Sequence, residues 1–236
     1  MDRNQIVSYV RNQLKKNSDV KTKASFQRFF KNPVLCYGVK SAAVGKISRD
    51  IYVYVNDLGK KALFEICEDL FKSGYCEESL IAAGWIHRKG DLEEKDFIAY
   101  GRWLDKYIDN WAECDTFCNH TVGDFIKKYP KYIKGLKIWA MSKNLWLRRA
   151  AAVSLIIPAK EGKFLEDIFE ITDILLLDTE DMVQKGYGWM LKEASRKHQK
   201  EVLEYVIKNK DRMPRTALRY AVEKMPERLR KTAMKK

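Results

Sequence analysis

Apolar side chains recur every three or four residues along almost the whole of this 236-residue chain. That spacing places them on one face of an α-helix, whereas a half-buried β-strand would alternate apolar and polar residues. Runs rich in Val, Ile and Thr, which favour strands, are almost absent apart from Ile51 to Val55. The sequence therefore predicts an all-α fold.

The joints between the expected helices are short, and several are marked by Gly or Pro, as at Asn32-Pro33, Ser73-Gly74 and Tyr129-Pro130. With only 12 Gly and 5 Pro in the chain, a mostly disordered or low-complexity protein is excluded. We expect one domain over residues 1–236. The expected helices cover residues 2–16, 20–30, 41–54, 57–72, 77–88, 91–107, 110–128, 131–142, 145–157, 161–176, 180–197, 199–208, 214–224 and 226–234.

Five segments that combine small residues with a basic or aromatic residue resemble one another weakly. They are ESLIAAGWIHRK, TFCNHTVGDFIK, LRRAAAVSLI, GYGWMLKEASRK and TALRYAVEKM, which begin at Glu78, Thr116, Leu147, Gly186 and Thr216. The starts are separated by 38, 31, 39 and 30 residues, and such a period is typical of stacked two-helix repeats. We therefore expect a HEAT-like helical-repeat solenoid with a concave basic groove; a helical bundle without repeats is the alternative.

The chain is strongly basic, with 45 Lys and Arg against 32 Asp and Glu and a formal net charge of +13. Residues 208–236, here called the basic segment, hold eleven of the bases and three of the acids. A second basic run contains Lys127, Lys128, Lys131, Lys134 and Lys137. Clustered positive charge attracts polyanions, so nucleic acid is the expected partner, although a lysine-rich solvated surface gives the same pattern.

No apolar run approaches the length of a membrane span, and the N-terminal MDRNQIVSYVRNQLKK lacks the apolar core of a signal peptide. We expect a cytoplasmic protein whose five cysteines are reduced. Common catalytic and nucleotide-binding signatures are missing. Cys114, Cys118 and His120 lie close together, but they lack the fourth ligand that zinc needs. We therefore expect no metal and no cofactor.

The segment DNWAECDTFCNHTVGDF carries an acidic residue on an apolar helical face. Helical spacing aligns Trp111, Asp115, Cys118 and Val122. An acid in such a place must find a partner, shift its pKa or line a cleft. Asp115 is therefore a candidate functional residue, and a pairing with a neighbouring arginine is the structural alternative.

Two consecutive arginines follow Trp146 in the segment WLRR, at the start of a helix that is otherwise small and apolar. Arg148 and Arg149 cannot both face the core. We expect one to point to solvent and the other toward the groove, where a guanidinium could hold a phosphate or pair with Asp115.

A third segment, GYGWMLKE, places Gly186 and Gly188 beside Trp189 within a helical pattern. Each helical glycine costs about 1 kcal/mol relative to Ala, so we expect these two to let a bulky group come close. Trp189 could be a core anchor, but Arg196 seven residues later suggests that this face meets polar groups.

Taken in order, WAECDTF, WLRR and GWMLKE resemble the AlkD-like DNA alkylation-repair glycosylases, a family of HEAT-like repeat proteins. The likeness extends from about Phe29 to near Met225. It includes YGVKSAAVGKI, from Tyr37 to Ile47, in which Ala stands where the family has Pro.

The resemblance implies a monofunctional N-glycosylase that removes cationic N3- and N7-alkylated purines from duplex DNA without flipping the lesion into a base pocket. It assigns the catalytic aspartate to Asp115, the sugar-contacting tryptophans to Trp111 and Trp189, and the phosphate-binding arginine to Arg149 or Arg148. The partner would be double-stranded DNA with alkylated bases, bound by a monomer.

Phe29 stands where this family often has a Tyr, which would remove one hydroxyl contact to DNA. The other candidate DNA-binding residues are Arg196, Lys127, Lys128, Arg215 and Arg219. Two other functions fit the same sequence: a non-catalytic relative that binds distorted or branched DNA, and a protein-binding helical scaffold whose lysines serve solubility.

Overall fold

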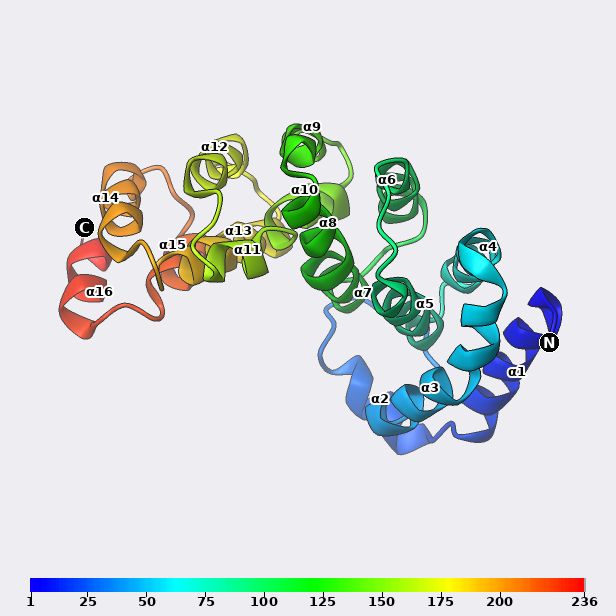
Figure 1. The fold of residues 1–236 in the computed structure, drawn as a ribbon. Helices are drawn as coiled ribbons and strands as arrows, with labels where there is room; N and C mark the ends of the chain where they lie inside the picture. The colour runs from blue at the N-terminus through cyan, green and yellow to red at the C-terminus, as the bar shows by residue number, and fades with distance from the viewer. Residues whose placement is uncertain (236) are drawn as a thin grey trace. The chain divides into compact units, whose positions relative to one another are not determined.

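The computed structural model describes residues 1–235, which are mostly helical and contain no β-strand; the longest connection is residues 28–40 (Figure 1). In chain order the elements are α1 (Arg3–Lys16), α2 (Val20–Gln27), α3 (Ser41–Asp57), α4 (Gly59–Lys72), α5 (Cys76–Lys89), α6 (Asp96–Lys106), α7 (Trp111–Phe117), the π-helical turn η1 (Cys118–Val122), α8 (Gly123–Lys128), the 3₁₀ turn η2 (Pro130–Tyr132), α9 (Ile133–Ala140), α10 (Leu145–Val153), α11 (Ile156–Lys160), α12 (Leu165–Leu175), α13 (Asp181–Ala194), α14 (Gln199–Asn209), α15 (Arg215–Val222) and α16 (Glu227–Met234). Lys236, the last residue of the basic segment, lies outside the described residues.

The all-α prediction is confirmed, and the one strand-like run belongs to a helix. Ile51 to Val55 lies within α3, where Ile47, Ile51 and Val55 are all buried. Their four-residue spacing puts them on one helical face, so burial overrides the strand preference of β-branched residues.

The chain divides into two compact units, Met1–Phe117 and Cys118–Lys236. Neighbouring helices pack in pairs: α4 with α5 in the first unit, and α9 with α10 and α12 with α13 in the second. One helix of a pair also packs on a helix of the next, as α5 does on α7, α10 on α13, and α13 on α15. Four of the five self-similar segments lie mainly on α5, α10, α13 and α15, and the one from Thr116 runs from the end of α7 through η1 into α8. This stacking confirms the predicted helical repeat. That residues 1–236 form one domain stays a prediction.

An aromatic cluster forms the core of the first unit where α4, α6 and α7 meet. The rings of Tyr100 and Phe117 meet edge to face at 5.3 Å between centroids, and those of Phe71 and Trp103 lie 5.4 Å apart. All four side chains are buried. Because aromatic rings bury large apolar areas, this cluster fixes α7 against the rest of the unit.

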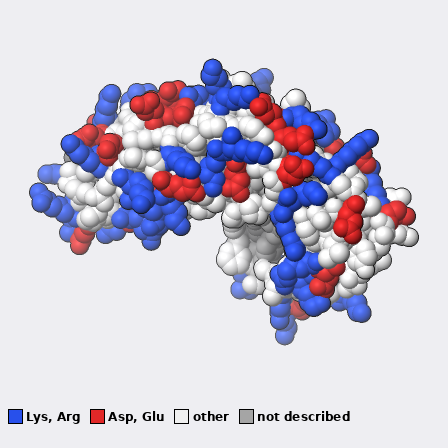
Figure 2. All heavy atoms as spheres, viewed as in Figure 1, with Lys and Arg blue, Asp and Glu red and all other residues white. Residues whose placement is uncertain are grey.

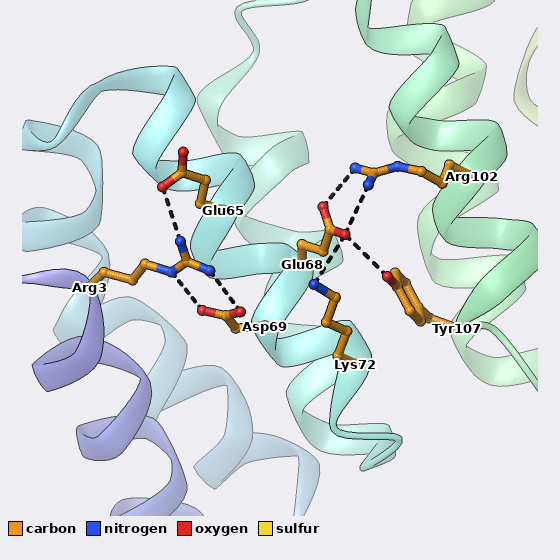
Figure 3. A network of polar contacts seen from close by, with 7 residues as sticks. All are labelled: Arg3, Glu65, Glu68, Asp69, Lys72, Arg102 and Tyr107. Carbon is orange, nitrogen blue, oxygen red and sulfur yellow. Dashed lines mark hydrogen bonds and ion pairs between the residues drawn. The ribbon is translucent and has the colours of Figure 1, made fainter.

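A polar network joins α1, α4 and α6 on the surface of the same unit (Figure 3). Arg3 donates hydrogen bonds to both carboxylate oxygens of Asp69, at 2.6 and 2.8 Å. Glu68, one residue earlier on α4, accepts from both terminal nitrogens of Arg102 on α6 and from the hydroxyl of Tyr107. Paired Arg–carboxylate geometry of this kind specifies which helices meet.

The segment before α3 is held by a buried carboxylate from α5. Glu77 accepts hydrogen bonds from the backbone N–H groups of Tyr37, Gly38 and Val39 at 2.8 to 3.1 Å. Gly38 has a φ of +85°, and a Cβ there would lie 2.6 Å from the Cβ of Lys23. The glycine of this YGV segment is therefore required by the connection.

The helix predicted over residues 110–128 is not continuous. It is α-helical to Phe117, passes through the π-helical turn η1, and becomes α-helical again at Gly123. A π turn widens the helix and changes which residues share a face. Shorter corrections apply elsewhere: α6 begins only at Asp96, α12 begins at Leu165, and the segment 145–157 is split into α10 and α11.

The glycines of GYGWMLKE do let bulky groups come close, as predicted. A Cβ on Gly188 would lie 2.7 Å from the Cβ of Tyr220 and 2.8 Å from the carbonyl oxygen of Ala217, so α15 packs directly against the backbone of α13. A Cβ on Gly186 would lie 3.4 Å from the Cγ of Arg149 on α10. These contacts explain why both positions in the second unit are occupied by glycine, which has no Cβ.

Candidate functional site

Trp111 begins α7 and is held by the segment that follows α2. Its indole Nε1 donates to the backbone carbonyl of Phe29 at 3.3 Å. The ring of Phe30 stacks on the indole at 5.3 Å with an interplanar angle of 23°, and Phe26 packs on Phe30 at 4.9 Å. Trp111 remains half-buried, so part of its ring faces solvent while its orientation is fixed.

Phe30 is a contact that sequence reasoning missed. We expected Phe29 to be the important aromatic, yet this residue is 69% exposed and its hydrogen bond with Trp111 is made by the backbone carbonyl. Two adjacent phenylalanines give no indication in the sequence of which ring packs on the tryptophan. The proposed contact of Phe29 with DNA stays a prediction.

Asp115 lies one helical turn after Trp111 on α7, and both side chains are partly exposed. This part of the predicted stripe is therefore consistent with the structure. Cys118 and Val122 are fully buried and lie within η1, so the predicted continuation of the stripe is wrong. The π turn ends the regular four-residue spacing on which the stripe was based.

A second carboxyl group on α7, that of Glu113, lies in a very different environment. Its side chain is buried, and Oε1 has no hydrogen-bond partner within residues 1–235. Burial, with a smaller contribution from the charge of Asp109, raises the pKa of Glu113 to about 8. Glu113 is therefore protonated at neutral pH, since its carboxylate would be poorly solvated. Sequence reasoning did not single it out.

Arg148 and Arg149 are both engaged within the second unit, so the expectation that one points to solvent is wrong. Arg148 Nε donates to Asp178 at 2.6 Å, and its Nη1 donates to two backbone carbonyls at 2.9 and 3.0 Å. Arg149 is 4% exposed, and its Nη1 donates to the carbonyl of Met182 on α13. Asp178 lies thirty residues from Arg148 in sequence, which hid this pair from local spacing rules.

Trp189 lies on α13 and is half-buried, between the buried residues Gly188 and Met190. Arg149 packs against the same helix at Gly186, so WLRR and GYGWMLKE are in contact. Arg196, expected on the face of Trp189, lies just beyond the end of α13 and pairs with Glu193. Its contact with DNA stays a prediction.

The two basic regions are less open to a polyanion than their charge suggests. Lys127 lies 3.0 Å from Asp124 and 3.1 Å from Glu161, whereas Lys128 is exposed and lies over the ring of Tyr129. Basic side chains gather over the C-terminal helices α15 and α16 (Figure 2). There, Arg219 is exposed, and Arg215 donates to the carbonyl of Met234 at 3.3 Å.

Within residues 1–235, no group of three or more His, Cys, Asp or Glu side chains is arranged to hold a metal ion. None of the helices in this part of the chain is both long and apolar enough to cross a membrane. All five cysteines are buried and unbridged.

The sequence model of the DNA alkylation repair enzymes matches residues 10–225. No curated protein sequence matches the chain. Among solved structures, a predicted DNA alkylation repair enzyme from Enterococcus faecalis superposes with a TM-score of 0.80, at 15% identity, over 89% of this chain and 98% of that chain. At that identity the superposition shows a shared fold.

Proposed function

Because the chain belongs to the DNA alkylation repair enzyme family, we propose that it is a monofunctional DNA N-glycosylase that releases cationic N3- and N7-alkylated purines from duplex DNA. The observation that carries the proposal is the arrangement on α7. A partly exposed carboxylate, Asp115, follows one turn after a tryptophan whose ring is fixed by Phe30 and by the carbonyl of Phe29.

The chemistry needs a stabiliser of positive charge on the sugar. An alkylated purine is already cationic and leaves readily, so the bond between base and sugar breaks with little protonation of the base, and the sugar acquires oxocarbenium character. A carboxylate beside that sugar stabilises its charge and orients the attacking water. In the proposal, Asp115 has this role.

Tryptophan faces add to the same effect. The electron-rich face of an indole attracts a cation with about 1 to 2 kcal/mol when water is excluded. We assign this role to Trp111 and Trp189. Trp111 is supported by its fixed but accessible ring, and Trp189 by its half-buried position on α13. In this scheme the lesion is not flipped into a base pocket.

Arg149 and Arg148 are the proposed phosphate contacts. Arg149 contacts α13 at Met182 and Gly186, so the arginine and Trp189 depend on the same helix for their positions. Arg148 is joined to Asp178 and to two carbonyls, which is the pattern of a residue that holds a helix start in place.

The test measures release of free alkylated bases from methylated duplex DNA by the wild type and by Asp115→Asn. Asn keeps the size of the side chain but removes its charge, and we expect a loss of about 10²- to 10³-fold in excision rate with DNA binding retained. The matched control is Asp50→Asn, an exposed acid on α3 paired with Lys46, which should leave excision unchanged.

Two results would contradict the proposal. Unchanged excision by Asp115→Asn would remove this residue from the mechanism. A folded wild type that binds DNA but releases no base would favour the non-catalytic DNA-binding relative instead.

A further inference from the structure

A pocket of about 700 Å³ lies in the second unit, where α13, α15 and α16 meet. We call it the C-terminal pocket. Its lining includes Asp181 and Lys185 from α13, Thr216, Arg219 and Tyr220 from α15, and Arg230 from α16. Its volume lies within the range of small-molecule binding sites, about 300 to 1,000 Å³.

The acids of this pocket are already paired with lysines. Asp181 lies 2.6 Å from Lys185, and Glu223, which also lines the pocket, lies 3.2 Å from Lys192. The remaining lysine of the lining, Lys231, lies 2.7 Å from Glu227. These charges therefore compensate one another locally.

Arg219 and Arg230 are different, because neither guanidinium has a hydrogen bond or an ion pair with any residue among 1–235. Two guanidinium groups at one pocket repel each other unless an anion lies between them. Each presents a planar set of donors that matches the oxygens of a phosphate, and Thr216 and Tyr220 bring hydroxyl groups to the same lining.

The helix that carries Arg230 is held in place by two side chains, one from α15 and one from the residue that follows α14. Arg215 donates to the carbonyl of Met234 at 3.3 Å, and Lys210 donates to the carbonyl of Lys235 at 2.8 Å. Both bonds satisfy carbonyls at the C-terminal end of α16, where positive charge is favourable. Arg230 is therefore presented from a fixed helix.

The pocket also extends beyond the part of the chain that the family accounts for. The family model matches residues 10–225, whereas α16 covers Glu227–Met234. Arg219 lies inside the matched region and Arg230 outside it. The second arginine is thus supplied by a helix that the family pattern does not include.

From these observations we infer that the C-terminal pocket binds a phosphate group between Arg219 and Arg230. The phosphate can come from the DNA backbone, in which case the inference rests on the proposed function, or from a free phosphate compound. Both sources present the same oxygens to the same two guanidinium groups, and the experiment separates them.

The first measurement is the affinity for an undamaged DNA duplex as a function of salt concentration, for the wild type, Arg219→Gln and Arg230→Gln. Each phosphate contact contributes about 0.9 to the slope of log K against log salt. If the source is DNA, each variant should lower the slope by about one. Arg228→Gln is the matched control, because Arg228 is an exposed arginine of α16 outside the pocket lining, and its slope should equal that of the wild type.

The second measurement is the melting temperature with added pyrophosphate. If the source is a free phosphate compound, pyrophosphate should raise the melting temperature of the wild type and of Arg228→Gln but not of Arg219→Gln or Arg230→Gln, with unchanged DNA slopes. Unchanged slopes together with no pyrophosphate effect would overturn the inference.

Both arginines are exposed and form no hydrogen bond or ion pair with residues 1–235, so circular dichroism of both variants should match the wild type. Base excision by the wild type is scored separately. A wild type without excision whose variants still change the salt slope or the pyrophosphate response would refute the proposed glycosylase but not the phosphate site.

Discussion

Glu113 should make the stability of this protein fall as pH rises, and Glu113→Gln should remove that dependence. Burial raises the pKa of this carboxyl to about 8 from its ordinary value of 4.5. Below about pH 4.5 the group is protonated in both the folded and the unfolded chain and has no effect. Between the two pKa values the folded protein keeps a proton that the unfolded chain has lost, so stability decreases with increasing pH. Above about pH 8 the full penalty of burying the charge is present.

The size of the effect follows from the raised pKa. One pKa unit corresponds to about 1.4 kcal/mol, and at pH 7 the unfolded chain has titrated through roughly two and a half units, so the penalty is about 3 kcal/mol. Gln has nearly the same shape as Glu and does not titrate. The free energy of unfolding of Glu113→Gln, relative to the wild type, should therefore increase by about 3 to 4 kcal/mol between pH 5 and pH 8.

The assay is urea unfolding followed by circular dichroism at pH 5, 6, 7 and 8. Glu166→Gln is the control, because Glu166 is an exposed glutamate on α12 and should differ from the wild type by a constant amount. A difference between Glu113→Gln and the wild type that does not change with pH would refute the argument, since it would mean that Glu113 titrates alike in both states.

Two further predictions concern packing around the proposed site. Phe30→Ala removes the ring stacked on Trp111 and should lower the rate of base excision about tenfold. The affinity for undamaged DNA should stay within twofold of the wild type. Equal losses of excision and affinity would show that Phe30 does not act through the orientation of the tryptophan. Gly188→Ala forces a Cβ against α15 and should lower the free energy of unfolding in urea by about 1 to 3 kcal/mol. Gly84→Ala, whose new Cβ has no atom within 4 Å, should instead raise it by up to about 1 kcal/mol. A Gly188→Ala variant as stable as Gly84→Ala would contradict the close packing of α13 on α15.

The spacing of apolar residues was sufficient to predict that the chain is helical, because local spacing determines which face of a helix is buried. The two glycines of GYGWMLKE illustrate how far such reasoning extends: a glycine within a helical pattern indicates a close approach, and the structure has α15 at Gly188 and Arg149 at Gly186. The pattern could not name either neighbour, because both come from other helices. The break at η1 was equally hidden, since a π turn does not alter composition.

Polar partners were the part of the site that the sequence could not predict. Arg148 donates a hydrogen bond to Asp178, and Glu77 accepts hydrogen bonds from three backbone N–H groups some forty residues away in sequence. Each pairing depends on helices that meet only in the folded chain. Glu113 was missed for a related reason, since α7 carries two acids, Glu113 and Asp115, and seven helical residues give no sign of which of the two lies on the buried face.

The basic segment shows that net charge indicates which class of partner a protein binds, but not how many of its charged side chains contact that partner. Of its bases, Lys210 and Arg215 bind the carbonyls that end α16, while Lys224 and Lys231 lie beside glutamates. Charges held in this way are partly neutralised before any polyanion arrives, and a helix end would lose its cap if they moved. Arg219 and Arg230, which share one pocket and have no acidic partner among residues 1–235, are the charges placed to hold a phosphate together. The slope of DNA affinity against salt concentration should therefore depend on the arginines of the C-terminal pocket and be smaller than the formal charge of +13 implies.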